Sequence, residues 1–274
     1  MTTGIGIIAW NRPKNLRRLL ESVVKNDLRD LEFHLFQDGN VCRFRGVETT
    51  FQIAIQKSIA TFQEFKLPRN TLHIRQENVS IAIHQYQALQ FLSSNYDKFI
   101  LIEEDTEISP YCLVLLTNAL EWAKKKPEIA SISPGFKKLG EDPKKIKLCN
   151  GHAWIEAFWS DRARKVLKEY QPYYDMVKYD YYKNRKDAEI FKFFKDNGFN
   201  GLASSQDNGR DYAVFKAGMT RARFVLNRAT GTGLEGFHSV PEKAIKHGEF
   251  NTEIYISEED KNLKEFIIND SSCS

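Results

Sequence analysis

Three adjacent carboxylates, Glu103, Glu104 and Asp105, follow an apolar run that ends at Ile102. Such carboxylates repel one another unless a cation or hydrogen-bond donors neutralise them. Oxygen ligands without imidazole or thiolate favour a hard divalent ion, Mg²⁺ or Mn²⁺. In a strand Glu103 and Asp105 point to one face and Glu104 to the other, so we expect Asp105 to be the metal ligand. The alternative is a solvated acidic turn that caps the helix expected after Pro110.

Three further side chains could bind a nucleotide if the fold brings them together. Arg12 offers a planar fork for a phosphate or a nucleobase carbonyl, or else is a surface residue beside a helix start. Asp38 could accept hydrogen bonds from a ribose or a base, although Asp-Gly-Asn also suits a turn. His84 lies inside an expected helix, where a lone histidine is more often a packed or surface residue.

A glycine-rich segment, residues 230–236, precedes His238. It lacks the Gly-Lys-Ser/Thr of a phosphate-binding P-loop. Its three glycines, Gly231, Gly233 and Gly236, suit a lid that closes over a bound donor, or a plain surface loop.

Apolar periodicity predicts the elements that position these residues. Continuous apolar runs predict strands at 4–9, 33–36, 72–75 and 99–102. Helical spacing predicts helices after Arg12, over 51–62 and 81–92, and after Pro110. The alternation indicates an α/β fold, a mostly parallel sheet with helices on both faces. Because ligands of such sheets bind beyond the carboxyl ends of the strands, we expect the polar residues after the four runs to converge on one crevice.

The sequence pattern changes near Lys137, which marks a subdomain change without a flexible linker. A lysine-rich loop is expected there, followed by a strand at 153–159, helices at 187–196 and 208–217, and a strand at 223–226. Six tyrosines lie between Tyr170 and Tyr182. They could stack on sugar rings or form a packed aromatic core.

Composition narrows the function classes. The chain has 274 residues, 42% hydrophobic and 28% charged, which is typical of a globular protein. Its net charge of +4 is spread along the chain, which argues against nucleic acid as a partner. The four cysteines have neither zinc-site nor disulfide spacing. We expect no transmembrane segment or signal peptide, and a cytoplasmic location.

The ordered motifs resemble a GT-A glycosyltransferase, and most of all the N-acetylglucosaminyltransferase I family. The motifs that carry this resemblance are Ile8-Ala-Trp-Asn-Arg-Pro13, Phe36-Gln-Asp-Gly39, His73-Ile-Arg-Gln76, Glu103-Glu-Asp-Thr-Glu-Ile-Ser-Pro110, Ile129-Ala-Ser-Ile-Ser133, Gly151-His-Ala-Trp154 and residues 228–238. They span about residues 4–240, and the acidic motif with its trailing Glu-Ile-Ser-Pro is the most specific.

The resemblance implies a Rossmann-like GT-A fold with a nucleotide-sugar-binding half, 1–136, and an acceptor-binding half, 137–274, packed as one continuous domain. It implies that Asp105 holds Mn²⁺ or Mg²⁺ against the diphosphate of a UDP-sugar such as UDP-GlcNAc. The implied donor-binding residues are Glu103 and Glu104 for ribose and sugar hydroxyls, Arg12, Asp38 and His84 for uridine, and Gly233 and His238 in the lid.

The family's catalytic base is an aspartate in an Asp-Asp-Trp context, best matched by Asp211, with Asp207 in reserve. Arg210 and Tyr212 replace the usual neighbours, and Arg210 is expected to keep Asp211 ionised. The implied reaction is a direct displacement by a hydroxyl of a glycan or glycoconjugate acceptor, which inverts the anomeric centre. A retaining enzyme would need a different arrangement.

Two other function classes remain open from the residues. A metal-dependent nucleotidyltransferase would also bind a nucleotide over a parallel sheet, but it usually needs a glycine-rich loop after the first strand, and residues 9–13 contain no glycine. A non-catalytic nucleotide-sugar-binding module would keep the fold without the base. An activity assay separates this module from an enzyme.

Overall fold

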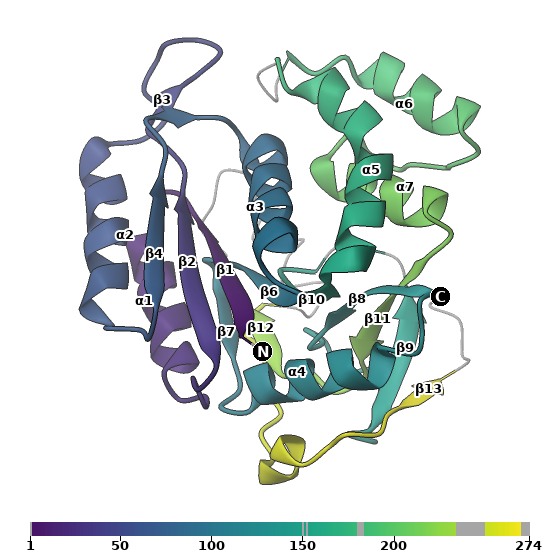
Figure 1. Cartoon of the computed structure of the whole chain (residues 1–274). Coiled ribbons are helices and arrows are strands. Elements are labelled where there is room, and N and C mark those ends of the chain that lie inside the picture. The colour runs from purple at the N-terminus through teal and green to yellow at the C-terminus, as the bar shows by residue number, and fades with distance from the viewer. Residues whose placement is uncertain (1, 150, 152, 180–183, 234–249, 270–274) are drawn as a thin grey trace.

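A computed structural model of the chain describes residues 2–149, 151, 153–179, 184–233 and 250–269. Its centre is a nine-stranded sheet with the order β13-β9-β11-β8-β10-β6-β1-β2-β4 (Figure 1). Five of the eight strand pairings described in this sheet are parallel. The predicted α/β class, a mostly parallel sheet flanked by helices, is confirmed.

The first half of the chain forms the elements that the sequence predicts. Four adjacent parallel strands are β4 Asn70–Ile74, β2 Leu31–Gln37, β1 Thr3–Ala9 and β6 Lys98–Glu103. The helices between and after them are α1 Pro13–Val23, α2 Gln52–Glu64, α3 Ile81–Asn95 and α4 Cys112–Ala123. Two short strands, β3 Val41–Cys42 and β5 Glu77–Asn78, pair with each other above the sheet edge.

Local sequence explains where these elements start and what they bury. All seven residues of β1 are buried, as expected of a parallel strand covered on both faces. In α1, Pro13 occupies the first helical turn, where its missing N–H costs no hydrogen bond. Leu16, Leu19, Leu20 and Val23 follow at helical spacing and are fully buried.

The second half contains more regular structure than its sequence predicts. Two strands of the first half remain, β7 Thr106–Ile108 and β8 Ile129–Ser133. The strands of the second half are β9 Lys145–Cys149, β10 Ile155–Trp159, β11 Thr220–Phe224, β12 Ala229–Gly231 and β13 Ile267–Asn269. Its helices are α5 Ser160–Val177, α6 Asp187–Asp196, α7 Gln206–Lys216 and a 3₁₀ turn at Glu258–Lys261. The strands β8 to β11 extend the same sheet beyond β6, so both halves of the chain contribute to it.

One expectation about this half is wrong, and one of its helices was not predicted. The lysine-rich stretch expected to be a loop contains β9, where lysines alternate with Ile146 and Leu148 in the period of a strand. The tyrosine-rich stretch begins inside the long helix α5, which continues through Pro172. Proline inside a helix removes a hydrogen bond, so packing against the sheet must compensate.

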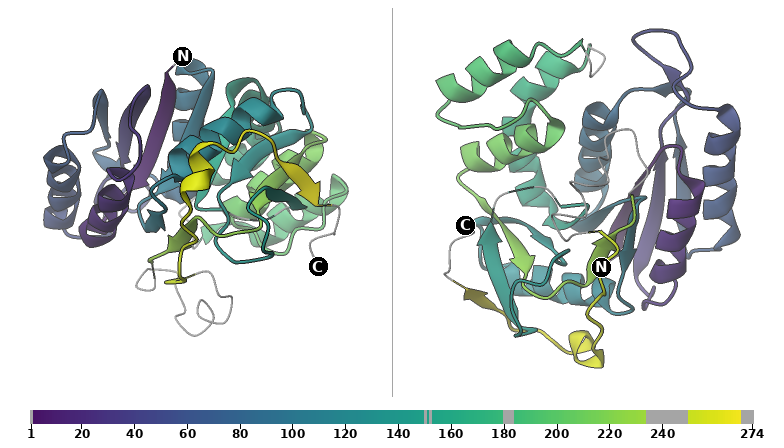
Figure 2. Two further views of the ribbon diagram at one scale, coloured as in Figure 1. Left: turned by 90° about the horizontal axis from the view of Figure 1, so that it is seen from below. Right: turned by 180° about the vertical axis from the view of Figure 1, so that it is seen from behind.

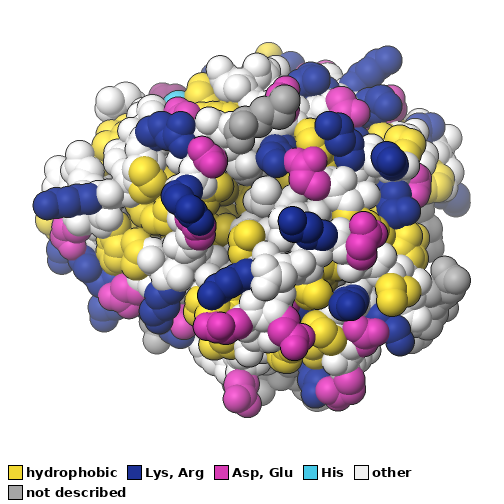
Figure 3. Space-filling model, turned by 60° about the horizontal axis from the view of Figure 1, so that its bottom comes forward, with side chains coloured by type: hydrophobic (Ala, Val, Ile, Leu, Met, Phe, Trp, Pro, Cys, Tyr) yellow, Lys and Arg dark blue, Asp and Glu magenta, His cyan; other side chains and the backbone are white. Residues whose placement is uncertain are grey.

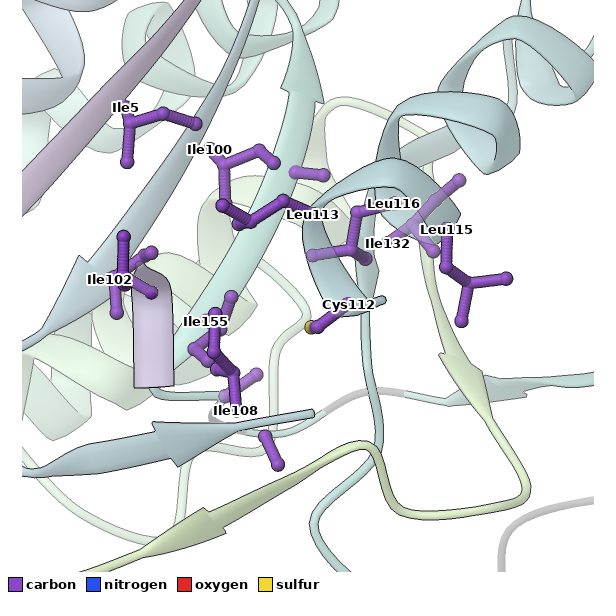
Figure 4. Close-up of a cluster of buried hydrophobic side chains, with 14 of the residues drawn as sticks. Ile5, Ile100, Ile102, Ile108, Cys112, Leu113, Leu115, Leu116, Ile132 and Ile155 are labelled. Carbon is purple, nitrogen blue, oxygen red and sulfur yellow. The ribbon is translucent and has the colours of Figure 1, made fainter. Parts of the chain in front are cut away.

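Two groups of helices cover the two faces of the sheet. Residues of α1, α2 and α4 share one apolar core with the strands, and residues of α3, α5, α6 and α7 share a second core. The green helices α5 to α7 therefore lie on the far side from the purple and blue helices α1 and α2 (Figures 1 and 2). Figure 4 shows part of the first core, where Leu113 and Leu116 of α4 lie beside Ile100 of β6 and Ile132 of β8.

The described tyrosines between Tyr170 and Tyr182 divide between core and surface. Tyr170 and Tyr173 are 3% and 0% exposed, and both belong to the second core. Tyr179 is 74% exposed, and Tyr181 and Tyr182 lie outside the described residues. Of the two predicted alternatives, the packed aromatic core therefore holds for Tyr170 and Tyr173.

The surface shows no separation of charge on the face seen in Figure 3, where lysines and arginines alternate with aspartates and glutamates. Within the described ranges, no helix is both long enough and apolar enough to cross a bilayer.

Buried histidines predict how stability depends on pH. Burial, with His73 nearby, lowers the pKa of His34 to about 4, and burial is also the main cause that lowers the pKa values of His73 and His84. Histidines of the unfolded chain titrate near 6.5, so below that pH the unfolded state binds more protons than the folded state. The free energy of unfolding should therefore be highest above about pH 7, where the histidines are neutral in both states. It should fall as the pH drops towards 4, by at most about 1.4 kcal/mol per pH unit for each histidine.

Urea denaturation at about pH 7.5, 6.5 and 5.5 measures this slope. His34→Gln should reduce it, because the variant removes a histidine whose pKa is well below its ordinary value in the folded state. An equal slope in wild type and His34→Gln would show that His34 does not contribute.

Candidate active site

The carboxyl ends of β4, β2, β1 and β6 meet at one edge of the sheet because the four strands are parallel neighbours. Backbone hydrogen bonds join the residues that leave them. Asp38 N donates to Ala9 O at 2.9 Å, Glu104 N donates to Ile8 O at 3.0 Å, and Arg75 N donates to Gln37 O at 3.0 Å. The predicted convergence of the four strand ends is therefore confirmed.

Arg12 bridges two members of the acidic motif. Its Nε donates to Glu104 Oε1 at 3.0 Å and its Nη1 donates to Asp105 Oδ2 at 2.6 Å. The backbone N–H of Trp10 donates to the second Glu104 oxygen, Oε2, at 3.0 Å. The loop after β1 thus supplies donors to the acidic end of β6, in agreement with the rule that such carboxylates need neutralising partners.

Burial and charge act in opposite directions on this cluster. Burial raises the pKa of Glu104, whereas the Arg12 charge and the Trp10 N–H lower it, and the net direction is upward. Burial alone would lower the pKa of Arg12, but the charges of Asp105 and Glu104 raise it above its ordinary value. Arg12 therefore remains a cation, held at the acidic motif by two carboxylates.

Asp105 keeps one oxygen for a further ligand. Its Oδ1 is buried and has no hydrogen-bond partner among the described residues, while Oδ2 pairs with Arg12. In the part of the chain that the structure describes, no three His, Cys, Asp or Glu side chains come together as a complete metal site. A hard divalent ion commonly takes only one or two protein carboxylates and completes its shell with phosphates and water, so the orphaned oxygen of Asp105 fits that role.

A segment from far along the chain covers the acidic motif. Strand β12 pairs antiparallel with β7, which places Gly231 opposite Thr106. Thr232 N donates to the backbone oxygen of Asp105 at 2.7 Å. Gly233 lies so close to this cluster that an added Cβ would be 2.1 Å from Asp105 Oδ2 and 3.1 Å from Arg12 Nη1. The start of the glycine-rich segment is thus next to the predicted metal ligand.

A buried ion pair anchors the chain that leads into β12. Arg228 and Asp260 are both 0% exposed, and two hydrogen bonds join them, from Nε to Oδ2 at 3.0 Å and from Nη2 to Oδ1 at 2.8 Å. Phe224 and Tyr255 lie against the guanidinium at 4.9 and 5.1 Å. Removing one partner would leave a buried charge, so the pair fixes where β12 begins.

Asp38 is a buried acceptor in the loop after β2. Its Oδ1 accepts from Gly39 N and Val79 N, both at 3.1 Å, and its Oδ2 accepts from Asn78 Nδ2 at 2.9 Å. Burial raises the pKa of Asp38. The electrostatic effect of His84 and the backbone donors Val79 and Gly39 act to lower it, but the net direction is upward. The carboxylate thus ties two strand ends together, and Oδ2 retains room for one more donor.

His84 is held on both sides of its ring. Arg75 Nε donates to Nδ1 at 3.1 Å, and the ring nitrogen Nε2 lies 2.9 Å from Phe36 O. Because Nδ1 accepts, Nε2 carries the proton and donates to the carbonyl oxygen. Both nitrogens are used within the protein, so the imidazole links α3 to β2.

Glu103 faces the second half of the chain. Gln85 of α3 donates to Glu103 Oε1 at 3.4 Å, and the charge of Glu103 is among those that raise the pKa of Arg210, after Glu156 and Asp207. A small cavity behind it is lined by Gln85, Glu156, Arg210 and Arg221 together with apolar residues.

The predicted base, Asp211, lies in α7 at the edge of a buried charged cluster. It pairs with Arg221 of β11 and also accepts a hydrogen bond from Gly151 N at 3.2 Å. The expectation that its neighbour Arg210 is its cation is wrong, because successive helical residues point in different directions. Arg210 instead pairs with Glu156 at 2.9 Å.

The reserve candidate, Asp207, begins the same helix. Its Oδ1 lies 3.9 Å from Arg210 Nη2, and Ser205, the residue before the helix, caps the helix by accepting from Asn208 N. Both aspartates thus lie beside arginines of one cluster.

Sequence reasoning missed the centre of this cluster, Glu156. It is 2% exposed, pairs with Arg210 and Arg221, and accepts from Ser131 Oγ at 2.7 Å. A signal was present, since a glutamate in the middle of the expected strand at 153–159 is rarely buried unless it is paired. Another predicted donor-site residue, His238, lies outside the described residues.

Comparisons with known proteins give weak likenesses. No family model matches the chain, and no curated protein matches its sequence. S. aureus TarS 1–349 in complex with UDP-GlcNAc matches with a TM-score of 0.48 and 12% identity, over 87% of this chain and 60% of that one. The galactosyltransferase LgtC, in complex with donor and acceptor sugar analogues, matches with a TM-score of 0.44 and 14% identity, over 79% of this chain and 72% of that one.

The mannosyltransferase PcManGT from Pyrobaculum calidifontis, in complex with GDP-Man and Mn²⁺, matches with a TM-score of 0.41 and 13% identity, over 61% of this chain and 45% of that one. The chain therefore spans less than two thirds of the TarS and PcManGT chains. Likenesses of this degree assign neither a family nor a function to it.

Proposed function

We propose that the chain is a metal-dependent glycosyltransferase that moves a sugar from a UDP-sugar to a hydroxyl of a glycan acceptor. The observation that carries the proposal is the acidic end of β6, where Asp105 keeps a buried oxygen without a partner beside Arg12 and under Gly233. The order of the sequence motifs, which resembles that of GT-A enzymes, supports the same reading. We propose UDP-GlcNAc as the donor on that resemblance alone.

The proposed donor site follows the strand ends. A Mn²⁺ or Mg²⁺ ion held by Asp105 would offset the charge that develops on the leaving diphosphate. Glu104 and Glu103 lie next to it and would accept hydrogen bonds from ribose or sugar hydroxyls. Asp38, at the end of β2, would accept from the uracil or ribose through its Oδ2.

The proposed acceptor side is the charged cluster of α7 and β11. Asp211 would take the proton of the attacking hydroxyl, and a direct attack opposite the diphosphate would invert the anomeric centre. Glu103 connects the two sides, because Gln85 links it to the cavity that Arg221 also lines. Arg221 in turn pairs with Asp211. Donor and base are thus joined by a short chain of contacts.

A nucleotidyltransferase remains the second enzyme class, and the structure offers no specific support for it. The β1–α1 connection is filled by Trp10, Asn11 and Arg12, and Trp10 Nε1 donates to Gly39 O at 3.0 Å. This connection places a bulky indole where nucleotidyltransferases usually carry glycines.

A screen of nucleotide sugars for thermal stabilisation, each with and without Mn²⁺, tests the proposed function. A ligand that binds only the folded state raises its stability, so a UDP-sugar should raise the melting temperature only when Mn²⁺ is present. Release of UDP with an added glycan acceptor would then show transfer. Stabilisation by nucleoside triphosphates alone, with release of pyrophosphate, would favour the nucleotidyltransferase.

Asp38→Ala should weaken UDP binding by about 10-fold, because it removes a buried charged acceptor while the metal ligand remains. Isothermal titration calorimetry with UDP and Mn²⁺ measures this loss, and circular dichroism checks the fold. Asn78→Ala is the matched control, since it removes a donor to Asp38 and disturbs the same loop without removing the carboxylate. Equal losses in both variants would show that Asp38 acts only as a turn former.

A further inference from the structure

We infer that Arg12 is an internal counter-ion of the acidic motif and that it makes cation binding at Asp105 depend on a bound nucleoside diphosphate. The inference rests on the proposed function and deepens it. It differs from the uridine contact that the sequence resemblance implies for this residue.

The geometry places Arg12 on the carboxylates. Both described hydrogen bonds of its guanidinium are to the acidic motif, with 3.0 Å from Nε to Glu104 Oε1 and 2.6 Å from Nη1 to Asp105 Oδ2. Glu104 is 2% exposed and the Asp105 side chain 11% exposed, so these interactions lie where water screens them little. A guanidinium so placed already performs part of the neutralisation that a metal ion would perform.

Arg12 and a divalent ion would share one carboxylate. The ion can reach Oδ1 of Asp105, which is buried and without a partner, while Arg12 remains on Oδ2. Two cations on one partly buried aspartate repel each other. Without a nucleotide, the protein should therefore bind the ion less tightly than a variant that has a neutral residue at position 12.

The surrounding backbone holds Arg12 in this place. Trp10 N fixes the other oxygen of Glu104, and Thr232 N fixes the backbone of Asp105. Gly233 packs against both Asp105 and Arg12, and only a residue without Cβ fits there. Helix α1 begins at Pro13, directly after Arg12, which limits the backbone on the other side.

A nucleoside diphosphate changes the balance of charge. Its phosphate oxygens are ligands for the ion and acceptors for a guanidinium, which binds phosphate through two parallel N–H groups. With the diphosphate present, both cations gain a negative partner and the repulsion between them is offset. Binding of the ion and of the diphosphate should therefore be mutually strengthening, and the coupling is reciprocal.

Binding of Mn²⁺ alone tests the inference without any nucleotide. Free Mn²⁺ is counted by electron paramagnetic resonance in titrations of wild type, Arg12→Gln and Arg18→Gln. Arg18 is the matched control, because it lies in α1, the helix that follows Arg12, and pairs with Glu107 of the same acidic segment at 3.0 Å, but on the exposed surface. We expect Arg12→Gln to bind Mn²⁺ at least about 10-fold more tightly than wild type, and Arg18→Gln to match wild type.

A second comparison guards against misfolding, since Arg12→Gln leaves Glu104 buried without its cation. Glu104→Gln is compared with the double variant Arg12→Gln/Glu104→Gln, in which no lone buried carboxylate remains at position 104. The double variant should bind Mn²⁺ more tightly than Glu104→Gln by a similar factor. Added UDP should then tighten Mn²⁺ binding less in the Arg12 variants than in wild type.

Equal Mn²⁺ affinity in wild type and Arg12→Gln, and equal affinity in the second comparison, would overturn the inference. An equal increase in Mn²⁺ affinity in Arg12→Gln and Arg18→Gln would also overturn it, because the increase would then come from the net charge of the protein. The proposed function fails by a different result, the absence of UDP-sugar binding in the presence of Mn²⁺. The two failures are therefore distinguishable.

Discussion

Asp105→Asn is expected to abolish metal-dependent binding of UDP and to lower kcat/KM for sugar transfer by about 1000-fold, the upper range for loss of one charge-stabilising group. The substitution keeps the size of the side chain but replaces a carboxylate oxygen by an amide nitrogen and removes the charge. In the structure that carboxylate is the only one of the described motif with a buried oxygen that lacks a partner.

Calorimetry with UDP and Mn²⁺, followed by a transfer assay, measures both effects. Glu107→Gln is the control, because Glu107 belongs to the same acidic segment but forms an exposed pair with Arg18, outside the strand-end cluster. Its variant should behave as wild type. Retention of metal-dependent UDP binding by Asp105→Asn would place the ion elsewhere and would remove the main support for the proposed site.

The strand ends could be predicted from sequence because parallel strands impose their own geometry. Once residues 4–9, 33–36, 72–75 and 99–102 are recognised as buried strands, the residues after them must share one edge of the sheet. This argument brought Arg12, Asp38 and the acidic motif together without any knowledge of side-chain contacts. The structure confirms it through the parallel pairing of β1 with β2 and β6.

Side-chain partners could not be predicted in the same way. Periodicity says which face of an element a residue occupies but not which of two nearby charges it pairs with. Arg210 was expected to be the partner of Asp211 because it is adjacent in sequence, whereas Arg221, ten residues later on β11, takes that place. The partner is set by the packing of α7 against β11, a tertiary contact that leaves no local signal.

The second half also shows where single-sequence patterns fail. The strand β9 alternates lysine with apolar residues, and this period of two was hidden by its lysine content. Helix α5 was not predicted because it contains Pro172, which is unfavourable inside a helix, and because its tyrosines also suit a binding surface. In both cases burial against the sheet overrides local propensity.

Asp211→Asn is expected to leave donor binding intact and to lower the rate of transfer by about 100-fold or more, the scale of a missing general base. The fold should tolerate the change for a specific reason. Arg221, which loses its partner Asp211, still pairs with Glu156 at 3.0 Å and donates to Gly151 O at 3.1 Å, so no arginine is left buried without an acceptor.

The ion pair with Arg221 sets a condition on this role. A carboxylate that is held by a guanidinium is a poor proton acceptor until one of its oxygens turns to the acceptor hydroxyl, within about 2.6 to 3.2 Å. In the structure Oδ1 takes both the Arg221 and the Gly151 contacts, and these are the hydrogen bonds described for Asp211, so we expect Oδ2 to be the oxygen that accepts the proton if Asp211 is the base. Calorimetry with UDP and Mn²⁺ measures donor binding, and a transfer assay under saturating donor measures the rate, so the two effects of the variant are separated.

Asp207→Asn is the matched comparison, because it removes a carboxylate one turn earlier on α7, near Arg210. A near wild-type rate in Asp211→Asn together with a large loss in Asp207→Asn would assign the base to Asp207, and equal small losses in both would show that α7 does not carry the base.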